Sequence, residues 1–209
     1  RNALWPGAVY ADPYGHTLII AKWIAPQEGR PGILLAADAQ PDNSVTRKRF
    51  WEGNFLFADI AGAGPGFKAF RPILRDEGRI HLASNTQLSE SAPAGRLSMA
   101  QENLSADDFY AEMERAINPS GLEPLDAYES KLSALLEQVQ TRVTAVQNGE
   151  VYAKQHRGSP IAMPQGAGIF ETTGPWEDFA SPSRDMRLLI ALNVVSKFPE
   201  QIRRHPELF

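Results

Sequence analysis

The sequence has 209 residues, of which 43% are hydrophobic, and it carries a formal net charge of −4 and no cysteine. A chain of this length can bury one sizeable core. The lack of cysteine excludes disulfides, thiolate metal sites and a thiol nucleophile within these residues. The scattered basic residues argue against a nucleic-acid partner, and no apolar run is long enough to span a membrane.

The composition constrains the cellular compartment less than it constrains the chemistry. A cysteine-free chain suits a secreted or periplasmic bacterial protein, with a cytoplasmic protein as the alternative. The first residue is Arg1 rather than methionine, which is typical of a processed product or of a fragment. A processed product can have lost a signal peptide. Nothing in the pattern indicates an oligomeric state.

Residues 1–83 are predicted to form a strand-rich part. Short runs of β-branched and aromatic residues alternate there with turns that contain glycine, proline and aspartate. The predicted strands are residues 8–10, 17–24, 33–37, 45–50, 54–57, 67–74 and 79–83. Residues 84–104 are polar and contain serine, proline and glycine, so we expect a linker or a surface excursion.

Residues 105–209 are predicted to form a helical part that packs on the same core. Ser105 followed by Asp108 resembles a capping box. The helix that it begins carries three apolar residues on one face, namely Phe109, Met113 and Ile117. A last helix is expected from Ser183 to about Phe198.

A longer helix is expected over residues 125–147, with Asn148 and Gly149 as its stop. Apolar residues recur there in steps of three and four, at Leu125, Tyr128, Leu132, Leu135, Val139, Val143 and Val146. Such a stripe favours burial in the core, with a partner-helix seam as the alternative. Strands in the first half and helices in the second predict an α+β fold, in which an antiparallel sheet packs against helices of the C-terminal half.

Two polar residues stand at the same end of a predicted hairpin. Pairing Ile24 with Ile33 places His16 opposite Pro41 and places Asp38 within one diagonal step of His16. A general base needs a carboxylate that fixes its tautomer and stabilises the imidazolium, and His16 with Asp38 fits that need. Asp42 is an alternative partner at the same end. The competing interpretation is that His16 and Asp38 are ordinary turn residues.

Residues 8–57 resemble the histidine- and aspartate-bearing strands of transglutaminase-like and papain-like cysteine enzymes. The resemblance lies in the stretches GHTLIIAKWI and GILLAADAQPDNS. It implies an acyl-transfer scaffold, as in a peptidase or amidase, with His16 as the base and Asp38 as its orienter. In that superfamily the nucleophilic cysteine heads a helix upstream of the histidine. The resemblance therefore implies a nucleophile outside these residues, or a scaffold retained without catalysis.

The aromatic loops offer a second function from another class. Trp176 stands between acidic residues in a loop rich in glycine and proline, and it can form a binding platform for a sugar or peptide. The alternative is that Trp176 fills the core while Glu177, Asp178 and Arg184 cap the last helix or pair across it. Trp51 can line a cleft near Asp38, or it can be a buried strand end. These features suit a non-catalytic exported binding or interaction protein.

Metal and cofactor sites find no support in the spacing of residues. The four histidines are far apart in the sequence, and no metal-ligand spacing, regular calcium loop or phosphate loop occurs. No Ser nucleophile lies in a Gly-x-Ser-x-Gly motif. We therefore expect no metal and no cofactor. If the protein is an enzyme, we expect a cysteine-type acyltransferase acting on a peptide or another amide.

Overall fold

The structure is a computed structural model that describes residues 4, 6–13, 15–39, 45–58, 65–68, 71–90, 101–166, 168 and 174–209. The chain forms two compact units. The first comprises Arg1–Asp38, Thr46–Leu122 and Glu207–Phe209, and the second comprises Ala39–Val45 and Glu123–Pro206. We call them the sheet unit and the helical unit.

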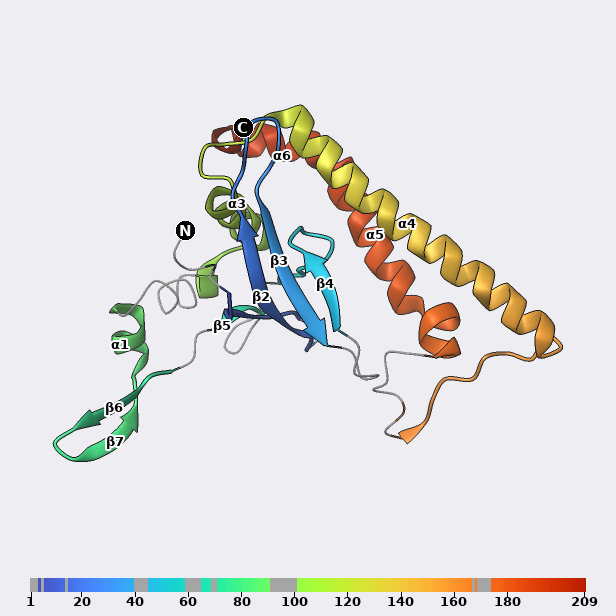
Figure 1. The fold of residues 1–209 in the computed structure, drawn as a ribbon, viewed down its shortest axis with the longest axis horizontal. Helices are drawn as coiled ribbons and strands as arrows, with labels where there is room; N and C mark the ends of the chain where they lie inside the picture. The colour runs from blue at the N-terminus through green and yellow to red at the C-terminus, as the bar shows by residue number, and fades with distance from the viewer. Residues whose placement is uncertain are drawn as a thin grey trace. The chain divides into compact units, whose positions relative to one another are not determined.

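The sheet unit is built around a five-stranded sheet (Figure 1). Its strands are β1 (Val9–Ala11), β2 (Thr17–Ile24), β3 (Ile33–Ala39), β4 (Val45–Arg49) and β5 (Gly66–Lys68). Their order across the sheet is β4-β3-β2-β1-β5. The pairs β1–β2, β1–β5 and β2–β3 are all antiparallel. Short connections suffice from β1 to β4, since antiparallel neighbours need only a turn, and β5 joins the far edge beside β1.

One face of the sheet is buried against α3 (Ala106–Ile117). Burial alternates along β3, where Leu34, Ala36 and Asp38 are buried, as expected of a strand with one covered face. The core joins both layers through Tyr10, Leu18, Ile20, Leu34, Ala36, Phe50, Phe55, Phe67, Phe109, Met113 and Ile117. The α+β fold predicted from the sequence is therefore confirmed.

The start of α3 follows the sequence prediction closely. The backbone N–H of Asp108 donates to the Oγ of Ser105 at 3.2 Å, and Ser105 Oγ donates to the Asp108 carboxylate at 2.6 Å. The first bond is that of an N-cap residue, while the second joins the two side chains instead of the acid and the Ser105 backbone N–H of a capping box. Phe109, Met113 and Ile117 lie on the buried face of the helix.

The remaining elements of the sheet unit are short. A two-stranded hairpin pairs β6 (Ile73–Asp76) with β7 (Arg79–Leu82), and α1 (Asn85–Glu90) follows it. The 3₁₀ turn η1 (Gln101–Asn103) precedes α3. Two of the predicted strands differ in the structure and a third agrees. Residues 54–57 form no strand, residues 67–74 are divided between β5 and β6, and residues 79–83 agree with β7.

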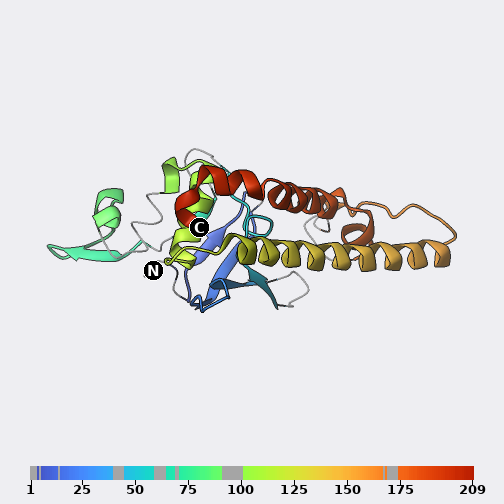
Figure 2. The same cartoon turned by 90° about the horizontal axis from the view of Figure 1, so that it is seen from above.

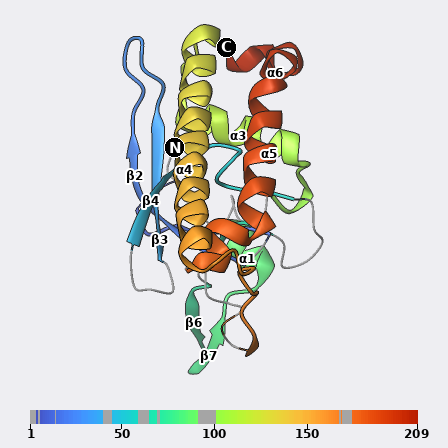
Figure 3. The ribbon, with the colours of Figure 1, turned by 90° about the vertical axis from the view of Figure 1, so that its right-hand side faces the viewer.

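The helical unit contains α4 (Pro124–Gln155), the π-helical turn η3 (Trp176–Ala180), α5 (Pro182–Ser196) and α6 (Phe198–Arg204). Figures 2 and 3 show α4 and α5 side by side and antiparallel, with α6 continuing from the end of α5. The last helical region is therefore two helices, and Ser181 rather than Ser183 caps the first of them. A 3₁₀ turn, η4 (Pro206–Leu208), follows α6.

The long helix does not stop where the sequence predicted. It runs through Asn148 and Gly149 to Gln155. A Cβ atom at position 149 would lie 2.8 Å from the Cβ of Phe179, which is closer than atoms can pack without a shift. Gly149 therefore serves close packing against η3, and it is not a helix cap.

The apolar stripe of α4 is also placed differently. Of its residues only Leu135 is buried, while Leu125 is 60% exposed and Val143 and Val146 are each 42% exposed. The residues of α4 that contact α5 and η3 include Arg142 and Gly149, and Ala127 is buried as well. The prediction that the whole stripe is buried was wrong, because the helix presents a different side to its neighbours.

The chain leaves the sheet unit and returns to it at adjacent points. The backbone N–H of Leu122 donates to the carbonyl of Leu208 at 2.8 Å. The Arg115 guanidinium binds the Glu207 carboxylate at 2.5 Å, and this interaction with the acid raises the pKa of Arg115. In the part of the chain that the structure describes, no helix is long and apolar enough to cross a membrane.

Candidate functional site

A β-bulge in β2 decides which side chains face the core. At the hairpin end of the pair, Ile24 lies opposite Ile33 and Trp23 lies opposite Leu34, as the sequence predicted. The register then shifts between Ile20 and Lys22, so that Ile20 pairs with Ala36 and Leu18 pairs with Asp38. An extra residue in one strand re-aims the side chains beyond it.

The shift exchanges the two faces of β2. Residues directly opposite in an antiparallel ladder project to the same side, and successive residues alternate. Leu18 and Ile20 are each 1% exposed and share the core face with Asp38. Without the bulge, Thr17 and Ile19 would take that face. His16 would then project to the opposite side from Asp38.

The ladder between β1 and β2 continues past the assigned strands. Ala11 pairs with Thr17, and one step further the Asp12 N–H donates to the His16 carbonyl at 2.9 Å. The His16 N–H in turn donates to Oδ1 of Asp12 at 2.9 Å. Asp12 is buried, and two residues before it Tyr10 faces the core. Continued alternation therefore puts Asp12 and His16 on the core face, two positions beyond the pair of Tyr10 and Leu18.

Asp38 is the most buried acidic residue of this region, with 1% of its surface exposed. Its carboxylate binds the Nζ of Lys48 on β4 at 2.6 Å. A buried charge needs a partner of this kind, because desolvation otherwise disfavours its ionised form. Lys48 lies beside Asp38 because β4 neighbours β3 in the sheet, and its side chain is 24% exposed.

Asp12, His16 and Asp38 thus surround Leu18 at one end of the core face. His16 is a diagonal neighbour of Asp38 across β2 and β3, and such neighbours have Cα atoms roughly 7–8 Å apart. Burial raises the pKa of Tyr10 well above its usual range. The nearby Tyr110 and Asp12 raise the pKa of Tyr10 further. The register thus puts His16 on the face that carries both carboxylates, and a histidine with a carboxylate neighbour is suited to proton transfer.

The other candidates from the sequence are placed as follows. Asp42 lies outside the described residues. Trp51 is only 6% exposed, and its indole Nε1 has no hydrogen-bond partner among the described residues. It is the buried strand end that the sequence allowed, and it presents little surface to a ligand.

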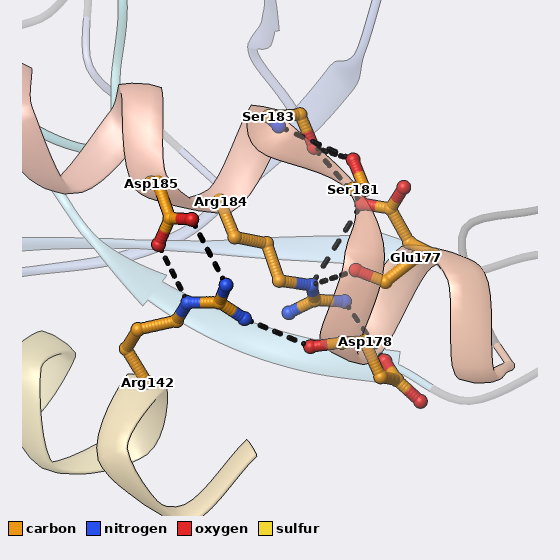
Figure 4. Close-up of polar contacts among 7 residues, drawn as sticks. All are labelled: Arg142, Glu177, Asp178, Ser181, Ser183, Arg184 and Asp185. Atoms are coloured by element: carbon orange, nitrogen blue, oxygen red, sulfur yellow. Dashed lines mark hydrogen bonds and ion pairs between the residues drawn. The ribbon is translucent and has the colours of Figure 1, made fainter. Parts of the chain in front are cut away.

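Trp176 begins η3 and is half-buried. The residues that follow it form a network of ion pairs and hydrogen bonds with α4 and α5 (Figure 4). The Arg184 Nε donates to the Glu177 carbonyl at 2.8 Å, and its Nη2 donates to the Asp178 carboxylate at 3.1 Å. The predicted pairing of these acids with Arg184 is confirmed.

A second arginine completes the network. Nε of Arg142 on α4 binds Oδ1 of Asp185 at 2.6 Å, and Nη2 binds Oδ2 at 2.9 Å. The same guanidinium donates to the carbonyl of Asp178 at 3.0 Å. Two parallel bonds between a guanidinium and a carboxylate fix the geometry of both groups. These acidic residues therefore serve to join α4, η3 and α5.

Sequence reasoning missed Asp12 and Lys48. In the sequence Asp12 looks like part of a turn, because it stands in the run Asp12-Pro13-Tyr14-Gly15. The signal for its burial is that Asp12 stands two residues after Tyr10, because alternate residues of a strand lie on the same face. Lys48 stands between Arg47 and Arg49, and nothing in the sequence indicates its pairing with Asp38.

No group of three or more potential metal ligands gathers among the residues that the structure describes. Comparison of the chain with protein-family models, with curated proteins and with solved structures found no match. The functional argument therefore depends on the geometry around Leu18.

Proposed function

We propose that the sheet unit carries the base and the orienter of an acyl-transfer site of the transglutaminase-like or papain-like kind, acting on peptide or related amide bonds. His16 is the general base, and Asp38 is the carboxylate that orients it and stabilises the imidazolium. The nucleophile comes from a cysteine outside these 209 residues.

The β-bulge in β2 is the observation that supports this proposal best. It places His16 on the same face as the buried Asp38 by interrupting a strand that otherwise pairs regularly. Bulges of this type occur preferentially next to active sites, where they re-aim a side chain. The same shift buries Leu18 and Ile20, so it serves the core as well as the placement of the histidine.

Lys48 fits the same arrangement as a support for Asp38. The ion pair gives the buried carboxylate a cationic partner, and the role of an orienter is to stabilise an imidazolium by its negative charge. A carboxylate binds more than one donor, so the contact with Lys48 leaves Asp38 able to accept from an imidazole N–H.

The test compares variants of the complete gene product on a generic peptide-amide substrate. His16→Ala should lower kcat by about 10²–10⁴-fold, since this is the usual contribution of a positioned acid–base group. Alkylation of the upstream cysteine with iodoacetamide should abolish turnover. The matched control is His156→Ala, at the end of α4, which should retain the wild-type rate.

Two results would overturn the proposal. One is an equal rate for His16→Ala and wild type, with the folded state of both confirmed by circular dichroism. The other is a complete gene product without any cysteine upstream of His16, because a base and an orienter without a nucleophile form no covalent acyl intermediate.

A further inference from the structure

The five-stranded sheet has a second face, opposite the one that packs on α3. Leu34 and Ala36 face the core, so Leu35 between them projects to the other side. Residues paired across an antiparallel ladder share a side, and Lys22, the partner of Leu35, therefore projects outward as well. The same alternation defines one surface, which we call the outer face, and its apolar part consists of Val9, Ile19, Ile24, Ile33 and Leu35.

Strand β4 adds two arginines to the outer face. Lys48 reaches the buried Asp38 on the core side of the sheet, and successive residues of a strand alternate between its two sides. Arg47 and Arg49 therefore project outward. Val45, at the start of β4, projects the same way and is 70% exposed.

The outer face thus combines an apolar part with cations from three strands. Lys68 of β5 lies opposite Val9 and joins Lys22, Arg47 and Arg49 on this side of the sheet. Lys22 and Arg47 are exposed, while Lys68 and Arg49 are half-buried. Within the five strands, which the structure describes in full, none of the outward-facing residues is acidic or aromatic.

This composition distinguishes between possible occupants of the outer face. A second copy of the chain would bring the same cations against one another, and facing like charges oppose association. Single-stranded nucleic acid is held through aromatic side chains on which its bases stack, and the outward-facing strand residues include none. The composition therefore fits an anionic occupant that also accepts aliphatic side chains.

The size of the outer face separates a protein from a lipid surface. Five strands about 4.8 Å apart, with roughly five residues each at about 3.3 Å per residue, cover about 400 Å². A specific protein partner usually buries about 800 Å² on each side. A fluid bilayer needs no matched area, and its headgroups and acyl chains offer anionic and apolar surface at one boundary.

We propose that the outer face is a docking surface for an anionic lipid bilayer. Its cations contact the lipid headgroups, and its isoleucines reach the boundary of the acyl chains. This inference goes beyond the proposed acyl transfer, whose residues lie on the opposite face of the sheet. The attraction grows with the number of basic residues near the membrane and is screened by salt, so the binding is reversible and depends on ionic strength.

The first experiment measures co-sedimentation of the full chain with lipid vesicles. The chain should bind vesicles of phosphatidylcholine with phosphatidylserine at low salt, and it should bind vesicles of phosphatidylcholine alone far more weakly. Lys22→Glu combined with Arg47→Glu should weaken the binding by at least about tenfold, because each cation near an anionic membrane contributes about fivefold. Circular dichroism and thermal unfolding confirm that this variant is folded.

A matched control reverses two exposed cations in another part of the chain. Lys154 and Arg157 lie at the end of α4 and just beyond it. The combined variant Lys154→Glu and Arg157→Glu has the same net charge as the test variant. It should bind phosphatidylserine vesicles as the wild type does.

The second experiment locates the contact with a fluorophore. The chain contains no cysteine, so Ile19→Cys provides a single labelling site on the outer face, where Ile19 is 51% exposed. The emission should shift to the blue when phosphatidylserine vesicles are added, and high salt should reverse the shift. The control is Ile80→Cys on β7, also at an exposed isoleucine, which should show no shift.

Four results would overturn the proposal. Failure to bind either kind of vesicle would mean that something else, such as another part of the same chain, covers the outer face. Equal binding of both kinds of vesicle would contradict the role of the cations. Equal binding by the double variant of Lys22 and Arg47 would place the contact elsewhere. Binding of poly-glutamate through Lys22 and Arg47, without binding of vesicles, would assign the outer face to an acidic protein.

Discussion

The side-chain amide of Gln101 binds both backbone groups of Phe67. The Phe67 N–H donates to Oε1 of Gln101 at 2.9 Å, and Nε2 of Gln101 donates to the Phe67 carbonyl at 2.5 Å. Phe67 lies on β5, the last strand of the sheet order. A glutamine thus takes the place of a further strand, and it satisfies groups that an edge strand leaves open.

Replacing Gln101 with methionine should therefore destabilise the sheet unit. The methionine fills a similar volume but removes both hydrogen bonds to the backbone of Phe67, at a cost of about 1–3 kcal/mol. Urea denaturation measures this change. Gln147→Met, at an exposed position of α4, is the control and should shift the free energy of unfolding by less than about 0.5 kcal/mol.

Gly149→Ala should destabilise the protein although it lies within a helix. An exposed glycine-to-alanine change in a helix interior normally stabilises by up to about 1 kcal/mol. Here the added Cβ would meet Phe179 at 2.8 Å, and such overpacking costs about 1–3 kcal/mol. Thermal unfolding should show a lower melting temperature. Adding Phe179→Ala should remove the penalty of the alanine, and a stable single variant would contradict the close packing.

The Asp38–Lys48 pair should show strong coupling in a double-mutant cycle. Lys48→Met removes the cationic partner of a buried carboxylate, and breaking one partner of a buried pair costs about 3–5 kcal/mol. Because Lys48 is partly exposed, we expect the lower part of this range. The double variant Asp38→Leu with Lys48→Met should be more stable than Lys48→Met alone. Additive effects would contradict the contact.

Stability should fall above about pH 10 because of two buried tyrosines. Burial is the main reason that the pKa of Tyr10 and of Tyr110 is raised in the folded protein. The unfolded chain releases these protons near pH 10, while the folded chain keeps them. The ionisation of these two tyrosines therefore leaves the free energy of unfolding unchanged below about pH 10. Above it the decrease is about 1.4 kcal/mol per pH unit for each tyrosine.

This decrease can be measured by urea denaturation at several alkaline pH values. Tyr110→Phe should reduce the slope by the share of one tyrosine, although it also loses the hydrogen bond from the hydroxyl to the Phe55 carbonyl. An unchanged slope in that variant would contradict the assignment.

Local patterns in the sequence were sufficient to predict several elements of the structure. The β-branched run 17–24, the pairing of Ile24 with Ile33 and the Ser105 cap depend on neighbouring residues only, and all three agree with the structure. Gly149 shows where such patterns stop. A glycine after asparagine signals a helix end unless a distant residue such as Phe179 needs the space, and the sequence does not reveal that contact.

The candidate site could be predicted from the sequence only in part, for the same reason. The antiparallel placement of the strands that bear His16 and Asp38 follows from the hairpin pattern. The register shift near Ala21 does not, because alanine in a β-branched run carries no sign of a bulge. The pairing of Lys48 with Asp38 depends on the neighbouring strand β4, whose alternating residues indicate only a half-exposed surface.

The hydrogen bond between Leu122 and Leu208 has a consequence for how the gene can change. Both ends of the segment 123–206 are fastened at one point of the sheet unit, so this segment is an insertion within another folded module. The entropy of closing a loop rises only with the logarithm of its length. The insertion can therefore be lengthened, shortened or exchanged for another module at little cost to its host.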